Sequence, residues 1–173
     1  MKKVVIAING RGGVGKDTLC DLAAKHFKVK NISSITPIKE FAARCGWGGE
    51  KDDKARKFLS DLKRVLVEYN DYSTVWAKGE YESFLESDDE VMFVHIREGA
   101  EIKKFVDITD GKAKTLLIRG GERMTKSSYG NASDDLVEEY DYDYYYVNEK
   151  DLETAEREFA ELLASIISAE NDN

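Results

Sequence analysis

The sequence predicts an α/β fold: a doubly wound parallel sheet of about five strands, flanked by helices in three layers. Short apolar runs rich in β-branched residues, such as residues 3–9, alternate with segments whose apolar residues repeat at helical spacing. A glycine-rich turn joins the first run to the first helical segment. Such alternation is typical of strands connected by crossover helices. We expect one domain over residues 1–173, because a chain of this length builds about one core.

The first part of the chain predicts two strands and two helices. Residues 3–9 are continuously apolar, as expected for a central parallel strand buried on both faces. A helix follows over about residues 15–27, and a second short strand over residues 29–35. Pro37 suits the first turn of a helix that ends at Gly46.

Two further helices are expected in the middle of the chain. The segment from Asp52 to Tyr69 has a clear helical period, and a second helix runs from Ser73, a good N-cap, to about Leu85. The apolar stripe of the longer helix consists of Phe58, Leu59, Leu62, Val65, Leu66 and Tyr69.

The last part of the chain predicts three more strands and two helices. Five tyrosines lie within residues 140–146, and we interpret this segment as a polar approach to a buried terminal strand. The expected elements are a strand at 90–96, a helix from Gly99, a strand at 114–118, a Gly- and Ser-rich loop at 120–132, a strand at 143–147 and a helix at 152–167.

The charge and the cysteines limit the classes of partner. A formal net charge of −8 argues against nucleic acid or an anionic membrane, because either would repel the chain. No apolar stretch reaches the roughly 18 residues of a membrane span. Cys20 and Cys45 form no metal-binding or disulfide pattern, which is typical of a reduced compartment. We therefore expect a cytoplasmic protein in which any phosphate site is a local basic pocket.

Residues 10–16 match the phosphate-loop pattern G-x-x-x-x-G-K. The glycines of this pattern let consecutive backbone N–H groups face phosphate oxygens, at the positive end of the following helix, and the lysine reaches the β- and γ-phosphates. The loop lies between a buried strand and a helix, which is the context that the pattern requires. The sequence therefore predicts a P-loop NTPase fold that binds ATP through Gly10, Arg11, Gly12, Gly13, Val14, Gly15, Lys16, Asp17 and Thr18.

Asp17 stands where this loop usually carries a Ser or Thr hydroxyl that contacts Mg²⁺. Triphosphate oxygens repel a carboxylate unless a cation lies nearby, although an acidic residue also stabilises the first turn of a helix. Thr18, one residue later, could offer its hydroxyl to a hydrated Mg²⁺ ion. We expect Mg²⁺ as a cofactor, with Asp17 and Thr18 as candidate ligands; the alternative is that Asp17 only stabilises the helix.

The loop resembles those of two protein groups. "GRGGVGKDT" resembles the "KGGVGKTT" loop of partitioning-type ATPases, but the Asp-x-x-Pro motif of that group is missing, because Pro37 is the only proline. The loop also resembles that of the nucleoside monophosphate kinases, and G-K-D-T itself occurs in the deoxynucleoside monophosphate kinase family. Further segments resemble that family in the same order: "ITPIKEFAARCGW", "ARKFLSDL", "VWAK", "FVHIREGAEIKKF", "TLLIRGG" and "DYYYVNEKDLETAEREFAELL".

This resemblance covers nearly the whole chain and implies two functional regions, an acceptor-binding helical region at about residues 36–87 and a lid-like loop at about residues 119–134. Two features depart from the family. His95 stands where the family has an Asp near the end of the third strand, so Asp17 or Glu98 would have to compensate as the acidic partner of Mg²⁺. The family's G-T-D element is also absent, so the base specificity does not carry over.

Phosphoryl transfer needs two anionic substrates held in line and cations around the migrating group. Arg97 and Arg119 follow predicted strands, where ligands of open α/β sheets bind. Arg123 lies in the lid-like loop. Candidate catalytic residues are therefore Lys16, Arg97, Arg119 and Arg123, and candidate acceptor contacts are Lys39, Arg44, Arg56 and Arg97.

These observations predict an enzyme, an ATP-dependent phosphotransferase that moves the γ-phosphate onto a (deoxy)nucleoside monophosphate or a similar small phosphorylated acceptor. Two alternatives stay open: a P-loop nucleotide-binding switch or regulatory ATPase, and a catalytically decayed kinase that acts as a binding module. Product formation with an acceptor separates the first from the other two. The sequence identifies neither the acceptor nor the oligomeric state.

Overall fold

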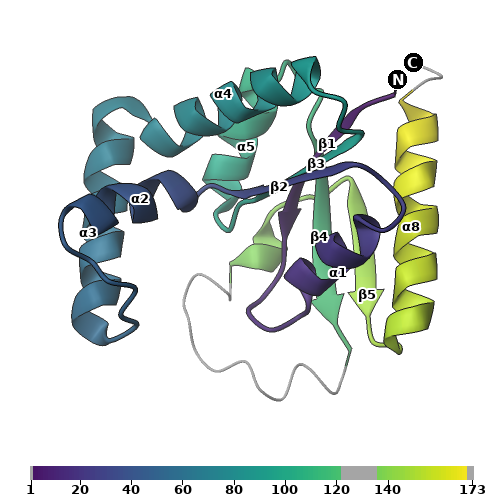
Figure 1. The fold of residues 1–173 in the computed structure, drawn as a ribbon, viewed down its shortest axis with the longest axis horizontal. Helices are drawn as coiled ribbons and strands as arrows, with labels where there is room; N and C mark the ends of the chain where they lie inside the picture. The colour runs from purple at the N-terminus through teal and green to yellow at the C-terminus, as the bar shows by residue number, and fades with distance from the viewer. Residues whose placement is uncertain (1, 122–135, 171–173) are drawn as a thin grey trace.

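The computed structural model describes residues 2–121 and 136–170, which contain a five-stranded parallel sheet. The strand order is β2-β3-β1-β4-β5, and all four pairings are parallel (Figure 1). This arrangement confirms the predicted doubly wound α/β fold, with crossovers on both sides of β1. The strands are β1 (Val4–Asn9), β2 (Val29–Ser33), β3 (Val91–His95), β4 (Lys114–Gly120) and β5 (Tyr144–Asn148).

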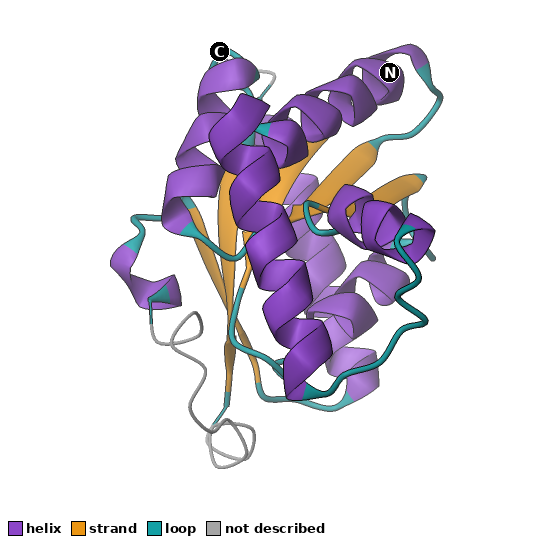
Figure 2. Ribbon diagram, turned by 90° about the vertical axis from the view of Figure 1, so that its left-hand side faces the viewer, coloured by secondary structure: helices purple, strands orange, loops and turns teal. Residues whose placement is uncertain are grey.

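Helices cover both faces of the sheet, as expected for three layers (Figure 2). One face packs against α1 (Lys16–Ala23) and α8 (Leu152–Ala169), and the other against α4 (Tyr72–Glu86) and α5 (Gly99–Ile108). The remaining elements are α2 (Thr36–Arg44), α3 (Asp53–Asn70) and the short 3₁₀ helix η1 (Val137–Glu139).

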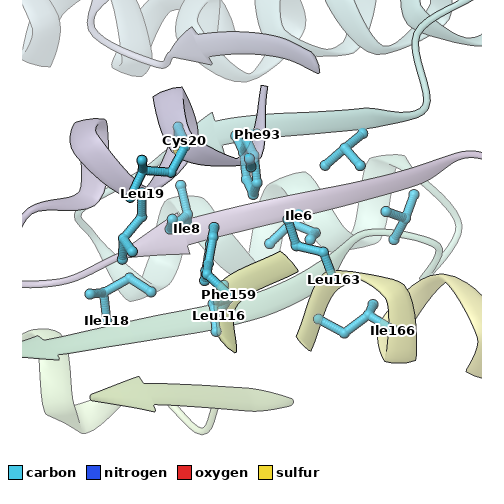
Figure 3. Close-up of a cluster of buried hydrophobic side chains, with 14 of the residues drawn as sticks. Ile6, Ile8, Leu19, Cys20, Phe93, Leu116, Ile118, Phe159, Leu163 and Ile166 are labelled. Atoms are coloured by element: carbon cyan, nitrogen blue, oxygen red, sulfur yellow. The ribbon is translucent and has the colours of Figure 1, made fainter. Parts of the chain in front are cut away.

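The central strand β1 divides the core into two clusters, because alternate side chains of a strand point to opposite faces. Ile6 and Ile8 face the α1–α8 side, where Phe159 and Leu163 of α8 pack against them (Figure 3). Val5 and Ala7 belong to the cluster under α4 and α5. All six residues of β1 are buried, which agrees with the uninterrupted apolar run seen in the sequence.

Two expected helix boundaries were wrong. The helix α1 ends at Ala23 rather than near Phe27. Ser73 is not an N-cap, because Asp71 adopts a left-handed conformation (φ 52°) that ends α3 and starts α4 with no loop between them. Lys104 of α5 forms an ion pair with Asp71 at this corner. Ser73 is therefore placed inside α4 and is buried.

The apolar stripe of α3 does not enter the core. Of the residues in this helix only Ala55 is buried, while Tyr69 is 83% exposed and Val65 is 51% exposed. The helix packs against α2 and α4 instead of the sheet, and Figure 1 shows it at the side of the molecule. Lys63 also ties it to α5 through ion pairs with Glu98 (2.8 Å) and Glu101 (3.1 Å).

The tyrosine-rich segment forms an edge strand rather than a fully buried one. Tyr144 and Tyr146 of β5 pack against the core under α8, whereas Tyr145 and Val147 are exposed. The segment that leads into the strand is less polar than expected, because Tyr142 is buried in the core under α5. Among the described helices none is long and apolar enough to cross a membrane.

Candidate active site

The loop between β1 and α1 has the backbone that its glycines predict. Gly10 has a φ of 153°, and a Cβ atom there would lie 2.4 Å from the carbonyl oxygen of Ile118 in β4. Gly15 has a φ of 86° and forms the N-cap of α1. Only glycine adopts these conformations without strain. The loop therefore lies at the carboxyl end of β1, with its last residues at the positive end of α1, where phosphate groups bind.

Lys16 extends over this loop. Its Nζ donates hydrogen bonds to the carbonyl oxygens of Gly10 (2.6 Å) and Arg11 (3.0 Å). The ammonium group is thus held beside the backbone that would surround phosphate oxygens. This placement fits the charge that the β- and γ-phosphates of ATP require.

Two buried asparagines bind backbone atoms of the loop. Asn9 at the end of β1 accepts a hydrogen bond from the Gly10 amide (2.8 Å). Asn148 at the end of β5 donates one to the carbonyl oxygen of Val14 (2.9 Å). Sequence reasoning missed both residues. Their only signal was a polar side chain that ends an apolar strand directly before a loop.

Asp17 and Thr18 lie in the first turn of α1, and both are exposed. Within the described parts of the chain, no three His, Cys, Asp or Glu side chains lie close enough to hold a metal ion together. Mg²⁺ in phosphoryl-transfer sites commonly uses only one or two protein oxygens and completes its shell with water and phosphates. The donors present therefore fit Mg²⁺ that is bound chiefly by the nucleotide.

His95 lies at the end of β3, beside the first turn of α1. Its Nε2 is 2.9 Å from Oδ1 of Asn31, 3.7 Å from Sγ of Cys20 and 3.8 Å from Oδ1 of Asp17. Burial lowers the pKa of this imidazole, although the nearby Asp17 carboxylate acts in the opposite direction. Burial also raises the pKa of the Cys20 thiol to about 12, so this thiol stays protonated. The uncharged pair fits a structural role.

Arg97 follows β3 and lines a pocket of about 610 Å³, and its backbone is hydrogen-bonded to Asn9, the residue that precedes the phosphate loop. The Asn9 side chain donates this bond to the Arg97 carbonyl oxygen (2.9 Å) and so fixes the backbone there. The pocket lies at the N-terminus of α5, whose partial positive charge adds to that of the guanidinium. The other lining residues are Glu98, Gly99, Ala100, Leu136, Glu139 and Tyr140.

Arg119 at the end of β4 is bound by a carboxylate. Its Nε and one terminal nitrogen donate to Glu138 of η1 (3.1 and 2.7 Å), and its guanidinium lies 4.7 Å from the ring centre of Tyr145. Hydrogen bonding to Arg119 lowers the pKa of Glu138, and the charge of Arg11 adds to this effect. The phosphate loop, β4 and η1 therefore meet at one cluster of charges.

The predicted acceptor contacts from α2 and α3 lie apart from this pocket. Lys39, Arg44 and Arg56 are exposed, and none of the three is among the residues that line the pocket beside Arg97. Arg56 lies 3.8 Å from Asp53 of its own helix. Arg123 and most of the lid-like loop predicted at residues 119–134 lie outside the described residues.

Comparison of the sequence with protein-family models and with curated proteins gives no match. Comparison of the structure with solved structures gives matches over nearly the whole chain. The fold resembles that of shikimate kinase from Aquifex aeolicus, with a TM-score of 0.53 and 13% identity over 96% of this chain and 98% of that one. It also resembles a gluconokinase from Sinorhizobium meliloti, with a TM-score of 0.55 and 14% identity over 97% and 95% of the two chains.

A third similar structure is shikimate kinase from Bacteroides thetaiotaomicron, with a TM-score of 0.51 and 16% identity over 93% of this chain and 98% of that one. Identities this low show a shared fold and nothing more specific. The chain therefore has the fold of P-loop kinases, as its first loop predicts.

Proposed function

We propose that this protein is an ATP-dependent phosphotransferase that moves the γ-phosphate onto a small acceptor. The observation that carries the proposal is a glycine-rich loop with Lys16 bound over it, preceded by Asn9, which is hydrogen-bonded to Arg97 of the pocket. Both lie at the carboxyl edge of a parallel sheet, where open α/β folds bind their ligands. A donor site and an acceptor site side by side are what an in-line transfer requires.

The roles of the side chains follow from this arrangement. The loop amides and the N-terminus of α1 would hold the phosphates of ATP, and Lys16 would stabilise the charge that develops on the transferred group. Asp17 or Thr18 would help to hold Mg²⁺, which would neutralise further charge on the phosphates. Arg97 would bind an anionic group of the acceptor at the opposite side of the reaction centre.

For the acceptor we propose a (deoxy)nucleoside monophosphate or a similar small phosphorylated compound. The support is the G-K-D-T loop and the order of segments that resemble the deoxynucleoside monophosphate kinase family. On this proposal Arg44 and Arg56 would belong to the acceptor side, together with residues 36–87.

A second acceptor class, a small hydroxylated carboxylic acid, is favoured by the charge of the pocket. Arg97 shares the pocket with Glu98 and Glu139, whose carboxylates would repel a phosphate dianion more strongly than a carboxylate monoanion. Glu98 is also bound to Lys63 (2.8 Å). Two of the similar structures are shikimate kinases and one is a gluconokinase, enzymes named for hydroxylated carboxylic acids.

A panel of acceptors tests the proposal. The protein is incubated with Mg-ATP and each nucleoside monophosphate, or with shikimate or gluconate, and ADP and phosphorylated product are both measured. Product from one compound supports the kinase function and identifies the acceptor class. ADP formation with no phosphorylated product would support a regulatory ATPase instead. Failure of every compound to yield product or ADP, with ATP still bound, would favour a binding module.

Two arginine variants then locate the acceptor. Arg97→Ala should lower kcat/KM for the acceptor by about 10- to 150-fold, since a charge-assisted hydrogen bond contributes about 1.5–3 kcal/mol. Arg56→Ala is the matched comparison, because Arg56 is exposed and does not line the pocket. An equally large loss in Arg56→Ala would place the acceptor on α3 and favour the monophosphate class.

A further inference from the structure

A buried side chain, Asn9, joins three segments at the carboxyl edge of the sheet. Its Oδ1 accepts a hydrogen bond from the amide of Gly10 (2.8 Å). Its Nδ2 donates to the carbonyl oxygen of Arg97 (2.9 Å) and to the hydroxyl of Tyr142 (2.8 Å). Asn9 is only 1% exposed, so no water competes for these bonds. Both protons of its amide nitrogen and its oxygen are satisfied.

Tyr142 continues this set of bonds. Its hydroxyl accepts from Asn9 and donates to the carbonyl oxygen of Val137 (2.8 Å), the first residue of η1. Tyr142 is 4% exposed, and its ring meets those of Tyr140 and Tyr145 edge-on, at centroid distances of 5.0 and 6.0 Å. The ring is therefore held by packing, and its hydroxyl has a fixed position.

The segments that are joined in this way are those on which the proposed reaction depends. Gly10 begins the phosphate loop, and Arg97 follows β3 and lines the pocket. Val137 begins η1, which carries Glu138, the partner of Arg119. A displacement of about 1 Å between donor and acceptor sites can cost about 100-fold in rate, so a rigid connection between them matters.

We propose that Asn9 and Tyr142 form a positioning pair that fixes the pocket at Arg97 relative to the phosphate loop and η1. Neither side chain needs to touch a substrate. The pair acts through the backbone atoms that it fixes, and its effect on the reaction rests on the proposed phosphotransferase function.

The chain offers a matched pair of variants. Tyr142→Phe removes one oxygen atom, which leaves the Val137 carbonyl and one proton of Asn9 without their partner. Tyr146→Phe removes the same atom from a tyrosine of β5 whose buried hydroxyl has no hydrogen-bond partner among the described residues. The ring of Tyr142 lies in the core and that of Tyr146 packs against it, so any general effect of losing a hydroxyl appears in both variants.

We expect Tyr142→Phe to raise the acceptor KM and lower kcat/KM for the acceptor by about tenfold, the effect of one ordinary hydrogen bond. The dissociation constant for ATP should change less than about threefold, because Asn9 still holds Gly10. A merely structural role would lower the active fraction, and thus kcat, while leaving the acceptor KM unchanged. Tyr146→Phe should match the unmodified protein in every constant.

Amide hydrogen exchange provides a readout that does not need activity. In Tyr142→Phe the amide of Gly10 should open more often and exchange about tenfold faster than in Tyr146→Phe, because Asn9, which still accepts its hydrogen bond in the closed state, has lost one of its own restraints. If the unmodified protein phosphorylates no acceptor, the proposed function fails, and exchange alone decides on the positioning pair. If the two variants are equal in exchange and in acceptor KM, the positioning pair is refuted whatever the activity.

Discussion

Alanine substitutions in the phosphate loop should distinguish glycines that need only their backbone conformation from glycines that also need space. Gly13 and Gly15 have similar left-handed φ angles of 80° and 86°. A Cβ atom at Gly13 would meet nothing within 4 Å. At Gly15 it would lie 2.6 Å from the side-chain nitrogen of Asn148, which donates to the carbonyl oxygen of Val14.

The cost of each variant follows from these contacts. A left-handed conformation costs a residue with a Cβ atom about 1–2 kcal/mol, so Gly13→Ala should lower the free energy of unfolding by that amount. Gly15→Ala carries the same cost and also displaces Asn148, whose hydrogen bond to Val14 contributes about 0.5–1.5 kcal/mol. We therefore expect a loss of about 1.5–3.5 kcal/mol for Gly15→Ala.

Urea unfolding of both variants, in the natural sequence and in an Asn148→Ala background, measures these terms. In that background the clashing amide is absent, so the two glycine variants should cost the same. Two results would contradict this expectation: equal costs of the two variants in the natural sequence, and a difference between them that persists in Asn148→Ala. Either result would refute the reasoning that Asn148 packs against Gly15 and holds the loop.

Three further predictions concern single side chains. Lys16→Ala should lower kcat about 100- to 1,000-fold, because its charge faces the phosphates, and should lower the free energy of unfolding by about 1–3 kcal/mol, because its two hydrogen bonds to the Gly10 and Arg11 carbonyls are lost; unchanged turnover would refute the placement of the ATP site. Burial lowers the pKa of His95 in the folded protein. Above about pH 6.5 the imidazole is neutral in both states, and the full stability is present. As the pH falls, the unfolded chain takes up a proton at His95 before the folded protein does, so stability is lost until the pH has fallen through the lowered pKa. Stability should therefore fall more steeply from pH 7.5 to 5.5 than in His95→Asn, and parallel curves would contradict this. Ser73→Ala should raise the free energy of unfolding, measured in urea, by about 1 kcal/mol, because the buried hydroxyl has no hydrogen-bond partner among the described residues. A decrease of about 1 kcal/mol would instead show that the hydroxyl has a partner.

The sequence predicts the fold well because the signals that it uses are local. The apolar run of β1 is buried along its whole length, and the strand–loop–helix order around Gly10 needs only neighbouring residues. The start of α4 is different. Ser73 has the chemistry of an N-cap, but the left-handed residue Asp71 lets α4 follow α3 directly, and Lys104 of α5 binds Asp71 there. This tertiary contact has no sequence signal in α4 itself.

The amphipathic period of α3 was a true signal of a helix, but it did not reveal what would cover the apolar stripe. Helical periodicity reports which residues share a face, whereas burial depends on whether another element lies against that face. Here α3 packs on α2 and α4 and is tied to α5 by Lys63, so Val65 and Tyr69 remain exposed.

The sequence likewise predicts one part of the candidate site and not the other. The phosphate loop is a contiguous motif, and its conformation follows from its own glycines. Asn9 and Tyr142 are 133 positions apart in the sequence. Nothing in the sequence distinguishes Asn9 from other polar residues at strand ends, or Tyr142 from other tyrosines of the core. Only the sheet order, which brings the segments beside β1 together, shows that these two side chains meet.

The same limit applies to the cations. The sequence counts Arg119 and Arg97 as equal strand-end charges, yet Arg119 is bound through two nitrogens to Glu138, whereas Arg97 lines the pocket. A phosphate dianion at this edge has two places to bind, and each has a cost. At Arg119 it would have to break the ion pair with Glu138, and beside Arg97 it would be repelled by Glu98 and Glu139. A monoanionic acid is repelled less by Glu98 and Glu139, and one ion pair with Arg97 would neutralise its charge. We therefore expect the charge of the acceptor, rather than the shape of its ring, to decide which members of the panel are phosphorylated.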